Sequence, residues 1–127
     1  MNTYSFEKLD VWQNSRIMVK DVYLVSKSFP KEEQFGLTSQ LRRAGISISC
    51  NIAEGVSRWS GKEKIRFIEI AYGSLMEVLN CLILAMDLEY MNYDQLEFLR
   101  LKIDVIAGQL NGLKKHLDTK SWIPLNL

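Results

Sequence analysis

The predicted fold is built around Leu37–Ser60, LTSQLRRAGISISCNIAEGVSRWS. Small and apolar residues recur in it every three or four positions, which places them on one side of a helix. They are Leu37, Leu41, Ala44, Ile48, Ile52 and Gly55. We therefore predict a helix over residues 37–59 that buries this side against neighbouring helices.

A second stripe on the same helix is polar and consists of Arg43, Ser47, Asn51 and Glu54. A solvent-facing stripe more often carries Lys and Glu than Ser and Asn, which are weak helix formers. This polar stripe is therefore expected to meet a partner.

Three further helices are predicted, over residues 10–28, 61–88 and 93–118. Their starts carry paired capping residues: Asp10 with Gln13, Ser60 with Glu63, and Asn92 with Gln95. Pro30 ends the first of them, because the residue before a proline is pushed out of the α region. The inward stripe of this first helix is Trp12, Ser15, Val19, Val22, Ser26 and Phe29, widened by Val11, Met18 and Val25.

The last helix has the clearest periodicity in the chain, at alternating spacings of three and four. Its stripe is Leu96, Leu99, Ile103, Ile106, Leu110, Leu113 and Leu117. Four helices with short connections predict an all-α, antiparallel up-down-up-down four-helix bundle, with residues 1–127 as a single domain. The tail, residues 119–127, carries Trp122, Ile123 and Leu125, which are expected to dock on the bundle or on a neighbour.

The helix over residues 61–88 is more apolar than one buried side requires. Its core stripe is Ile65, Ile68, Ala71 or Tyr72, Leu75, Val78 or Leu79, Leu82 and Met86. Further apolar residues lie away from that stripe: Phe67, Ile70, Cys81, Leu84 and Leu88. In so short a chain we expect another subunit to cover them, although exposed apolar residues are also common in monomers.

Composition places the chain among ordinary globular domains, with 47% hydrophobic and 24% charged residues. The net charge of +1 is too near neutral to indicate a polyanionic partner by itself. No uninterrupted apolar run reaches the roughly 18 residues of a membrane span, and the N-terminus lacks the regions of a signal peptide. We therefore expect a cytoplasmic protein without membrane association.

The two cysteines are expected to be reduced. If residues 37–59 and 61–88 form an antiparallel hairpin, Cys50 and Cys81 lie about 16 Å apart along the helix axis, beyond the reach of a disulfide. We interpret both as small packed side chains.

Catalytic and metal-binding patterns are missing from the sequence. The single histidine, His116, is expected to interact with the negative end of its helix rather than act as a base. Paired Glu-x-x-His motifs, Cys-x-x-Cys motifs and a glycine-rich phosphate loop do not occur. The sequence thus predicts a non-enzymatic protein with no catalytic residues, cofactor, metal or small-molecule substrate.

In the hairpin register, the polar stripe lies level with complementary groups on the next helix: Arg43 with Glu77, Ser47 with Gly73 and Ser74, Asn51 with Glu69, and Glu54 with Arg66. A polar ladder between the two helices is one interpretation. The alternatives are a solvated face with local pairs, or a face covered by another subunit.

Two basic clusters are candidates for a nucleic-acid rim. The first is Arg42, Arg43, Arg58, Lys62, Lys64 and Arg66, with Trp59 among them as a residue that could stack on a base. The second is Lys114, Lys115 and Lys120. In the predicted topology both fall at the same end of the bundle, although Glu54, Glu63 and Glu69 dilute the charge. A solvated helix junction is the alternative.

Several motifs together resemble a known family. They run from Gly36 to Ala44, then through Ser47-Ile48 and Asn51-Ile52-Ala53-Glu54-Gly55, and they continue in Phe6, Leu9, Trp12, Phe29-Pro30, Arg66-Phe67, Ala71–Leu75 and Glu77. The chain resembles the four-helix-bundle proteins encoded in intervening sequences of bacterial 23S ribosomal RNA genes. Cys50 stands where a small residue is common, which is a mild departure.

The resemblance implies a homopentamer of up-down bundles and no established biochemical activity. Its motif residues Gln40, Arg43, Ser47, Asn51, Glu54 and Gly55 are candidates for an assembly or binding stripe. A related branch serves as the accessory protein of diversity-generating retroelements and binds a reverse transcriptase and nucleic acid. The near-neutral charge of this chain is a poor match to that strongly basic branch.

Two functions are consistent with the sequence. The first is a non-enzymatic oligomer that contacts RNA or an RNA-handling partner. The second is a protein-interaction scaffold with no direct nucleic-acid binding.

Overall fold

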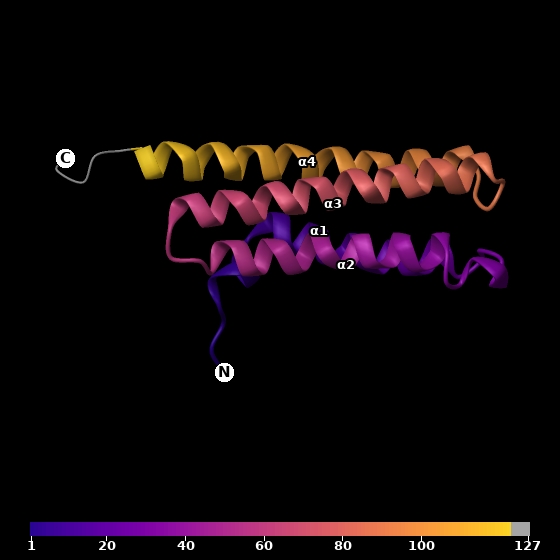
Figure 1. Cartoon of the computed structure of the whole chain (residues 1–127), viewed down its shortest axis with the longest axis horizontal. Coiled ribbons are helices and arrows are strands. Elements are labelled where there is room, and N and C mark those ends of the chain that lie inside the picture. The colour runs from indigo at the N-terminus through magenta and orange to yellow at the C-terminus, as the bar shows by residue number, and fades with distance from the viewer. Residues whose placement is uncertain (123–127) are drawn as a thin grey trace.

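Four α-helices form a bundle in which successive helices run in opposite directions (Figure 1). The structure is a computed structural model that describes the backbone of residues 1–122 and the side chains of residues 1–118. The helices are α1 (Asp10–Ser26), α2 (Leu37–Val56), α3 (Gly61–Asp87) and α4 (Tyr93–Trp122), with short 3-10 helices η1 (Ser5–Lys8) and η2 (Lys31–Glu33). Each α-helix contacts two others, so residues 1–122 contain one helical core and no strand. The predicted all-α four-helix fold is confirmed.

Two predicted helix starts are confirmed by side-chain hydrogen bonds. The Glu63 N–H donates to Ser60 Oγ at 3.1 Å at the start of α3. Before α4, the Gln95 N–H donates to Asn92 Oδ1 at 2.8 Å and the Asn92 N–H donates to Gln95 Oε1 at 2.9 Å. Each bond satisfies an amide that the helix leaves without a partner.

The capping pair predicted for Asp10 and Gln13 is wrong. Leu9 holds the N-cap position of α1 and makes no side-chain capping bond. Gln13 Nε2 instead donates to the Glu7 carbonyl at 2.9 Å. The reason is that η1 ends at Lys8, one residue before Leu9. Leu9 therefore takes the N-cap position, and Asp10 is already the first residue of α1.

Three helix ends differ from their predicted positions. α1 ends at Ser26 and α2 at Val56, two and three residues early, because turns occupy the residues before η2 and α3. α4 continues to Trp122, past the predicted end at 118, since no residue after 117 stops a helix before Pro124. The docking expected of Trp122, Ile123 and Leu125 lies outside the described side chains.

The predicted apolar stripes of the four helices supply most of the core, but Val19 of α1 and Ile65 of α3 are half-buried and lie outside it. On α3, where the sequence left two options, Ala71 and Val78 are fully buried while Tyr72 and Leu79 are half-buried. By length and composition, α3 alone among the described helices could cross a membrane. It is, however, the helix that packs most extensively in this bundle, against both α2 and α4.

Both cysteines are free thiols, but only Cys81 is packed. Cys81 is 4% exposed and belongs to the core, so it is not part of the apolar surplus of α3. Cys50 is exposed, which corrects the expectation that both thiols are buried. It lies on the outer side of α2, where the helix rotation turns it away from the core stripe.

Close packing of α2 against α3 depends on Gly55. A Cβ atom built on Gly55 would lie 2.7 Å from Phe67 Cβ and 3.4 Å from the Lys64 carbonyl oxygen. Neither atom is the far end of a flexible side chain, so the two helices would have to move apart. The glycine therefore sets the spacing of the hairpin near its turn.

We expect Gly55→Ala to destabilise the protein by about 1–3 kcal/mol through overpacking. Gly73→Ala on α3 is the matched control, because a Cβ atom at Gly73 meets nothing within 4 Å. There the substitution should stabilise the exposed helix by about 0.5–1 kcal/mol. Urea unfolding of both variants measures whether the free energy of unfolding falls or rises. Equal changes in the two variants would contradict the close approach at Gly55.

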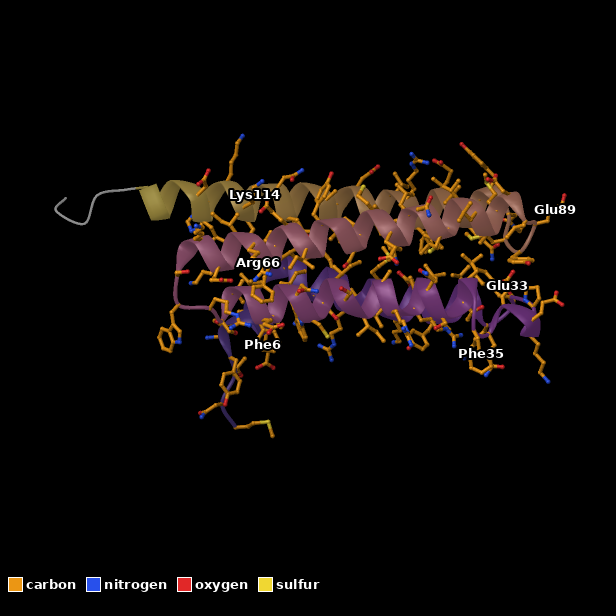
Figure 2. All side chains as sticks on the ribbon, in the orientation of Figure 1. Phe6, Glu33, Phe35, Arg66, Glu89 and Lys114 are labelled. Atoms are coloured by element: carbon orange, nitrogen blue, oxygen red, sulfur yellow. The ribbon has the colours of Figure 1, made fainter. Side chains whose placement is uncertain are left out.

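The carboxylate of Glu33 connects three segments at the end of the bundle opposite the α2–α3 turn. Glu33 accepts a hydrogen bond from the Leu37 N–H at 3.1 Å and another from the Tyr90 hydroxyl at 2.8 Å. These bonds favour the charged form and hold the pKa of Glu33 below its usual value, while the same carboxylate raises the pKa of Tyr90. Figure 2 shows Glu33 at this end, beside Phe35.

The lowered pKa of Glu33 predicts an acid-sensitive contribution to stability. Because the folded pKa lies below the unfolded value near 4.5, the contribution is complete above that pH and is lost as pH falls through the folded pKa. Glu33→Gln should therefore lose less stability than wild type between pH 5 and about pH 3. Thermal unfolding across that range, with Glu32→Gln as the control that keeps the wild-type slope, tests this.

Candidate assembly and nucleic-acid surfaces

The middle of the polar stripe on α2 is hydrogen-bonded to α3. Ser47 Oγ and Ser74 Oγ lie 2.7 Å apart, which confirms the predicted hairpin register. Asn51 Nδ2 donates to the Ser47 carbonyl at 2.8 Å and to Ser47 Oγ at 3.0 Å. These three side chains thus form one network between the helices, and at this level the stripe serves the fold.

Arg43 and Glu77 lie at the same level but make no ion pair with each other within the described residues. Both line a hollow of about 490 Å³ on the outer surface of α2 and α3. The hollow is completed by Phe35, Ser39, Gln40, Ala44 and Ser47. Phe35 is 91% exposed, so its ring has no cover inside the chain. We call this region the α2/α3 hollow.

The other side-chain pairs predicted between α2 and α3 do not form. Glu54 Oε1 accepts from Arg58 Nη2 at 2.7 Å, one helical turn along α2, rather than pairing with Arg66. Glu69 accepts from Lys114 Nζ at 2.9 Å, so it faces α4 and not Asn51. Only Ser47 and Ser74 therefore join the two helices through the predicted pairs, because α3 turns Arg66 and Glu69 away from α2.

The bond from Lys114 to Glu69 places the end of α4 beside the start of α3. The two basic clusters therefore meet at the end of the bundle that holds the α2–α3 turn, which we call the turn end. Figure 2 shows Lys114 and Arg66 toward this end, away from Glu33 and Glu89. The side chain of Lys120 lies outside the described residues.

Two arginines predicted for this rim lie elsewhere. Arg42 Nε donates to Ser26 Oγ at 2.9 Å, and its guanidinium stacks 4.5 Å from the centre of the Tyr23 ring on α1. At 1.5 Å per residue, Arg42 is about 21 Å along α2 from the last residue of the helix, Val56. Arg43 is its neighbour and lines the α2/α3 hollow, so neither contributes to the turn end.

Three cations at the turn end are already paired with acids. Besides Arg58 with Glu54 and Lys114 with Glu69, Arg66 lies 3.7 Å from Glu63. Such exposed pairs contribute little to stability, but each cancels most of the local charge. The Arg58 guanidinium also stacks 4.5 Å from the centre of the Phe67 ring.

Three residues of the rim keep their binding groups available. Trp59 is fully exposed, at 101% of its reference area, on the turn between α2 and α3. Lys62 is exposed and Lys64 is half-buried, and neither side chain makes a hydrogen bond or ion pair within the described residues. An uncovered indole beside two uncommitted ammonium groups can stack on a base and contact a phosphate. Lys115 is exposed at the same end.

Metal chemistry finds no support in the described residues, where no group of three or more His, Cys, Asp or Glu side chains comes together. His116 is exposed near the end of α4.

The surplus apolar residues of α3 are partly uncovered: Ile70 is 40%, Leu84 43% and Leu88 52% exposed.

An apolar face on α1 and α4 was missed at the sequence level. Phe98, Leu101 and Val105 are 54–65% exposed on α4, beside Ile17 and Leu24 of α1. In the sequence these three α4 residues form a second apolar series with spacings of three and four, offset from the core stripe. This series is shorter than the core stripe, which dominates the apolar pattern of the helix.

These features define an all-α, antiparallel four-helix bundle without a described catalytic or metal centre. The chain belongs to the family of 23S rRNA-intervening sequence proteins, whose family model matches residues 7–112. No match to a curated protein was found.

A similar solved structure is a protein of unknown function from the S23 ribosomal protein family of Bacteroides thetaiotaomicron. It is 26% identical, with a TM-score of 0.74, over 83% of this chain and 98% of that one. The fold and family predicted from the sequence are confirmed. The relation to retroelement accessory proteins stays a prediction.

Proposed function

We propose that this protein is a non-enzymatic cytoplasmic helical bundle that assembles into a ring through its α2/α3 surface and contacts RNA at the turn end. One observation carries the RNA contact: Trp59 is fully exposed beside Lys62 and Lys64. A buried indole gains a large hydrophobic free energy, so a ligand that covers this exposed ring would gain that free energy on binding. A base is a suitable cover because every base offers a flat face.

Assembly is supported by the α2/α3 hollow. Arg43 and Glu77 line it without an ion pair between them, and Phe35 lies uncovered at its edge. Ile70 and Leu84 of α3 add exposed apolar area nearby. A neighbouring subunit would cover the aromatic ring and supply partners for both charges. The family resemblance implies five subunits.

A second candidate function is a protein-interaction scaffold without direct RNA binding. The specific observation in its favour is charge pairing: Arg58, Arg66 and Lys114 are each bound to a glutamate at the turn end. A weak net field attracts polyanions poorly. This candidate requires that substitutions of the turn-end lysines leave function unchanged.

For assembly, we expect light scattering to give a mass that is a multiple of five chains of 14.7 kDa. Arg43→Ala should lose this five-fold assembly, because removing one partner from a covered ion pair leaves a buried charge and costs about 3–5 kcal/mol. Lys62→Ala is the control and should keep the wild-type mass. A monomeric wild type would exclude the ring, and a fully assembled Arg43→Ala would place the hollow outside the subunit contact.

For RNA, we expect a single-stranded oligonucleotide to bind more weakly as salt rises, since phosphate contacts release counterions. Trp59→Ala should weaken binding by about 1–3 kcal/mol through lost stacking. Lys62→Ala should lower the salt slope by about 0.7, the value for one phosphate contact on a single strand. Lys27→Ala, which removes an exposed lysine at the opposite end, is the matched control.

Filter binding measures all four proteins in the same salt series. Binding that is absent at low salt, or that is indifferent to salt, rejects the RNA function and favours the scaffold.

A further inference from the structure

Helix α4 carries a second stripe on its outer side, which we call the outer stripe. It consists of Phe98, Leu101, Val105, Gly108 and Gly112, at spacings of three, four, three and four. Phe98 is 56%, Leu101 65% and Val105 54% exposed. This spacing is the seam along which two helices pack in a coiled coil.

The two glycines of the outer stripe have no explanation within the chain. A Cβ atom at either Gly108 or Gly112 would meet nothing within 4 Å. Neither glycine has a positive φ angle, so the backbone does not require them. Glycine within an exposed helix is less favourable than alanine. Close approach by a helix from outside the chain would compensate that cost.

The uncovered surface extends onto α1. Ile17 is 47% and Leu24 57% exposed. Between α1 and α4 there are two hollows, one lined by Leu24 and Phe98 and the other by Ile17 and Val105. The ion pair of Lys102 with Asp21, at 2.7 Å, spans the two helices and lines both hollows, Asp21 in one and Lys102 in the other.

The size of this surface suits a subunit contact. The five exposed apolar side chains present roughly 500 Å², close to the largest apolar patch of a typical monomer. A stable contact buries about 800 Å² per partner. Polar residues at the rim of the contact would supply the area beyond that of the apolar patch.

We propose that a second copy of this chain packs on this face, with its α4 antiparallel to the first α4 about a two-fold axis at Val105. Phe98 and Gly112 each lie seven residues from Val105. An antiparallel partner therefore places Phe98 level with Gly112 of the partner subunit. Leu101 lies four residues before Val105 and Gly108 three after it, so these two also fall nearly level.

In this arrangement Phe98 and Leu101 each meet a glycine of the other copy, in the manner of a knob in a hole, while Val105 meets Val105 of the other copy at the axis. A parallel arrangement would instead set Phe98 against Phe98 and leave the glycines facing each other. Glycine opposite glycine would leave a gap, and two phenylalanines at one level would hold the helices apart. The pattern of large and small residues therefore selects the antiparallel orientation.

Charge supports the same orientation. Asp94 and Glu97 stand near the start of α4, whereas Lys115 and His116 stand near its end. Antiparallel packing about Val105 brings the carboxylates of one copy level with the basic end of the other. Parallel packing would bring like charges together.

This contact is separate from the proposed ring, because α1 and α4 lie on the side of the bundle opposite to the α2/α3 hollow. A two-fold contact adds copies in pairs. It would make a dimer of a single bundle and join two rings if the ring forms.

Cysteine cross-linking tests the two-fold axis directly. In a Cys50→Ser background, Val105→Cys should form a disulfide between two copies under mild oxidation, since both thiols lie at the axis within bonding reach. Lys20→Cys, on the exposed outer side of α1, is the control. We expect at least a tenfold higher yield of cross-linked dimer from Val105→Cys.

Gly108→Leu is the complementary variant, because its side chain fills the place of the incoming Leu101. It should abolish the Val105→Cys cross-link and halve the mass measured by light scattering, while circular dichroism shows a folded helical protein. Lys27→Leu, at an exposed position at the end of α1 and outside both proposed contact surfaces, should change neither.

Three results would overturn the proposal: equal yields from Val105→Cys and Lys20→Cys, a Gly108→Leu protein that cross-links like its parent, or an unchanged mass. None of these depends on RNA binding or on Arg43. A failure here is therefore distinguishable from a failure of the proposed function.

Discussion

Gly55 lets α2 and α3 approach so closely that a Cβ atom at this position would lie 2.7 Å from Phe67 Cβ and 3.4 Å from the Lys64 carbonyl oxygen. Farther along the pair, Ser47 and Ser74 meet through their hydroxyl groups at 2.7 Å. Small residues at both levels give this pair the most extensive contact in the bundle. Because α1 and α4 pack against the outside of this pair, the positions of the turn, the hollow and both outer faces depend on it.

The same closeness determines which charges remain available. On α2 and α3 the arginines nearest the turn find glutamates one helical turn away, as Arg58 does with Glu54. Local pairing of this kind needs no tertiary contact and lowers the net field of the turn end. What remains for recognition is the exposed indole of Trp59 and the lysines that follow it.

Opposite sides of the bundle differ in chemistry. The α2/α3 surface combines a polar hollow around Arg43 and Glu77 with the uncovered ring of Phe35. The α1/α4 surface is mainly apolar and contains the outer stripe of Phe98, Leu101 and Val105 with its two glycines. A mixed polar surface and a flat apolar seam favour different contacts, and a bundle with both can make two kinds of subunit contact.

The helices, most of their core stripes and the hairpin register could be predicted from the amino-acid sequence. These follow from local rules: periodicity at 3.6 residues, the capping pairs at Ser60 and Asn92, and the level of Ser47 with Ser74. The family also followed from the motifs of α2 and α3. All of these properties depend on residues that are close in sequence or on adjacent helices.

The partners of the long side chains depend on tertiary packing and could not be predicted from the sequence. Arg42 binds Ser26 and Tyr23 on α1, Glu69 binds Lys114 on α4, and Cys81 is buried while Cys50 is not. A rotation of 100° per residue separates neighbouring side chains on a helix, so small differences in packing reassign a partner. Periodicity predicts which side of a helix is buried. The exact rotation of the helix about its axis depends on its contacts with the other helices.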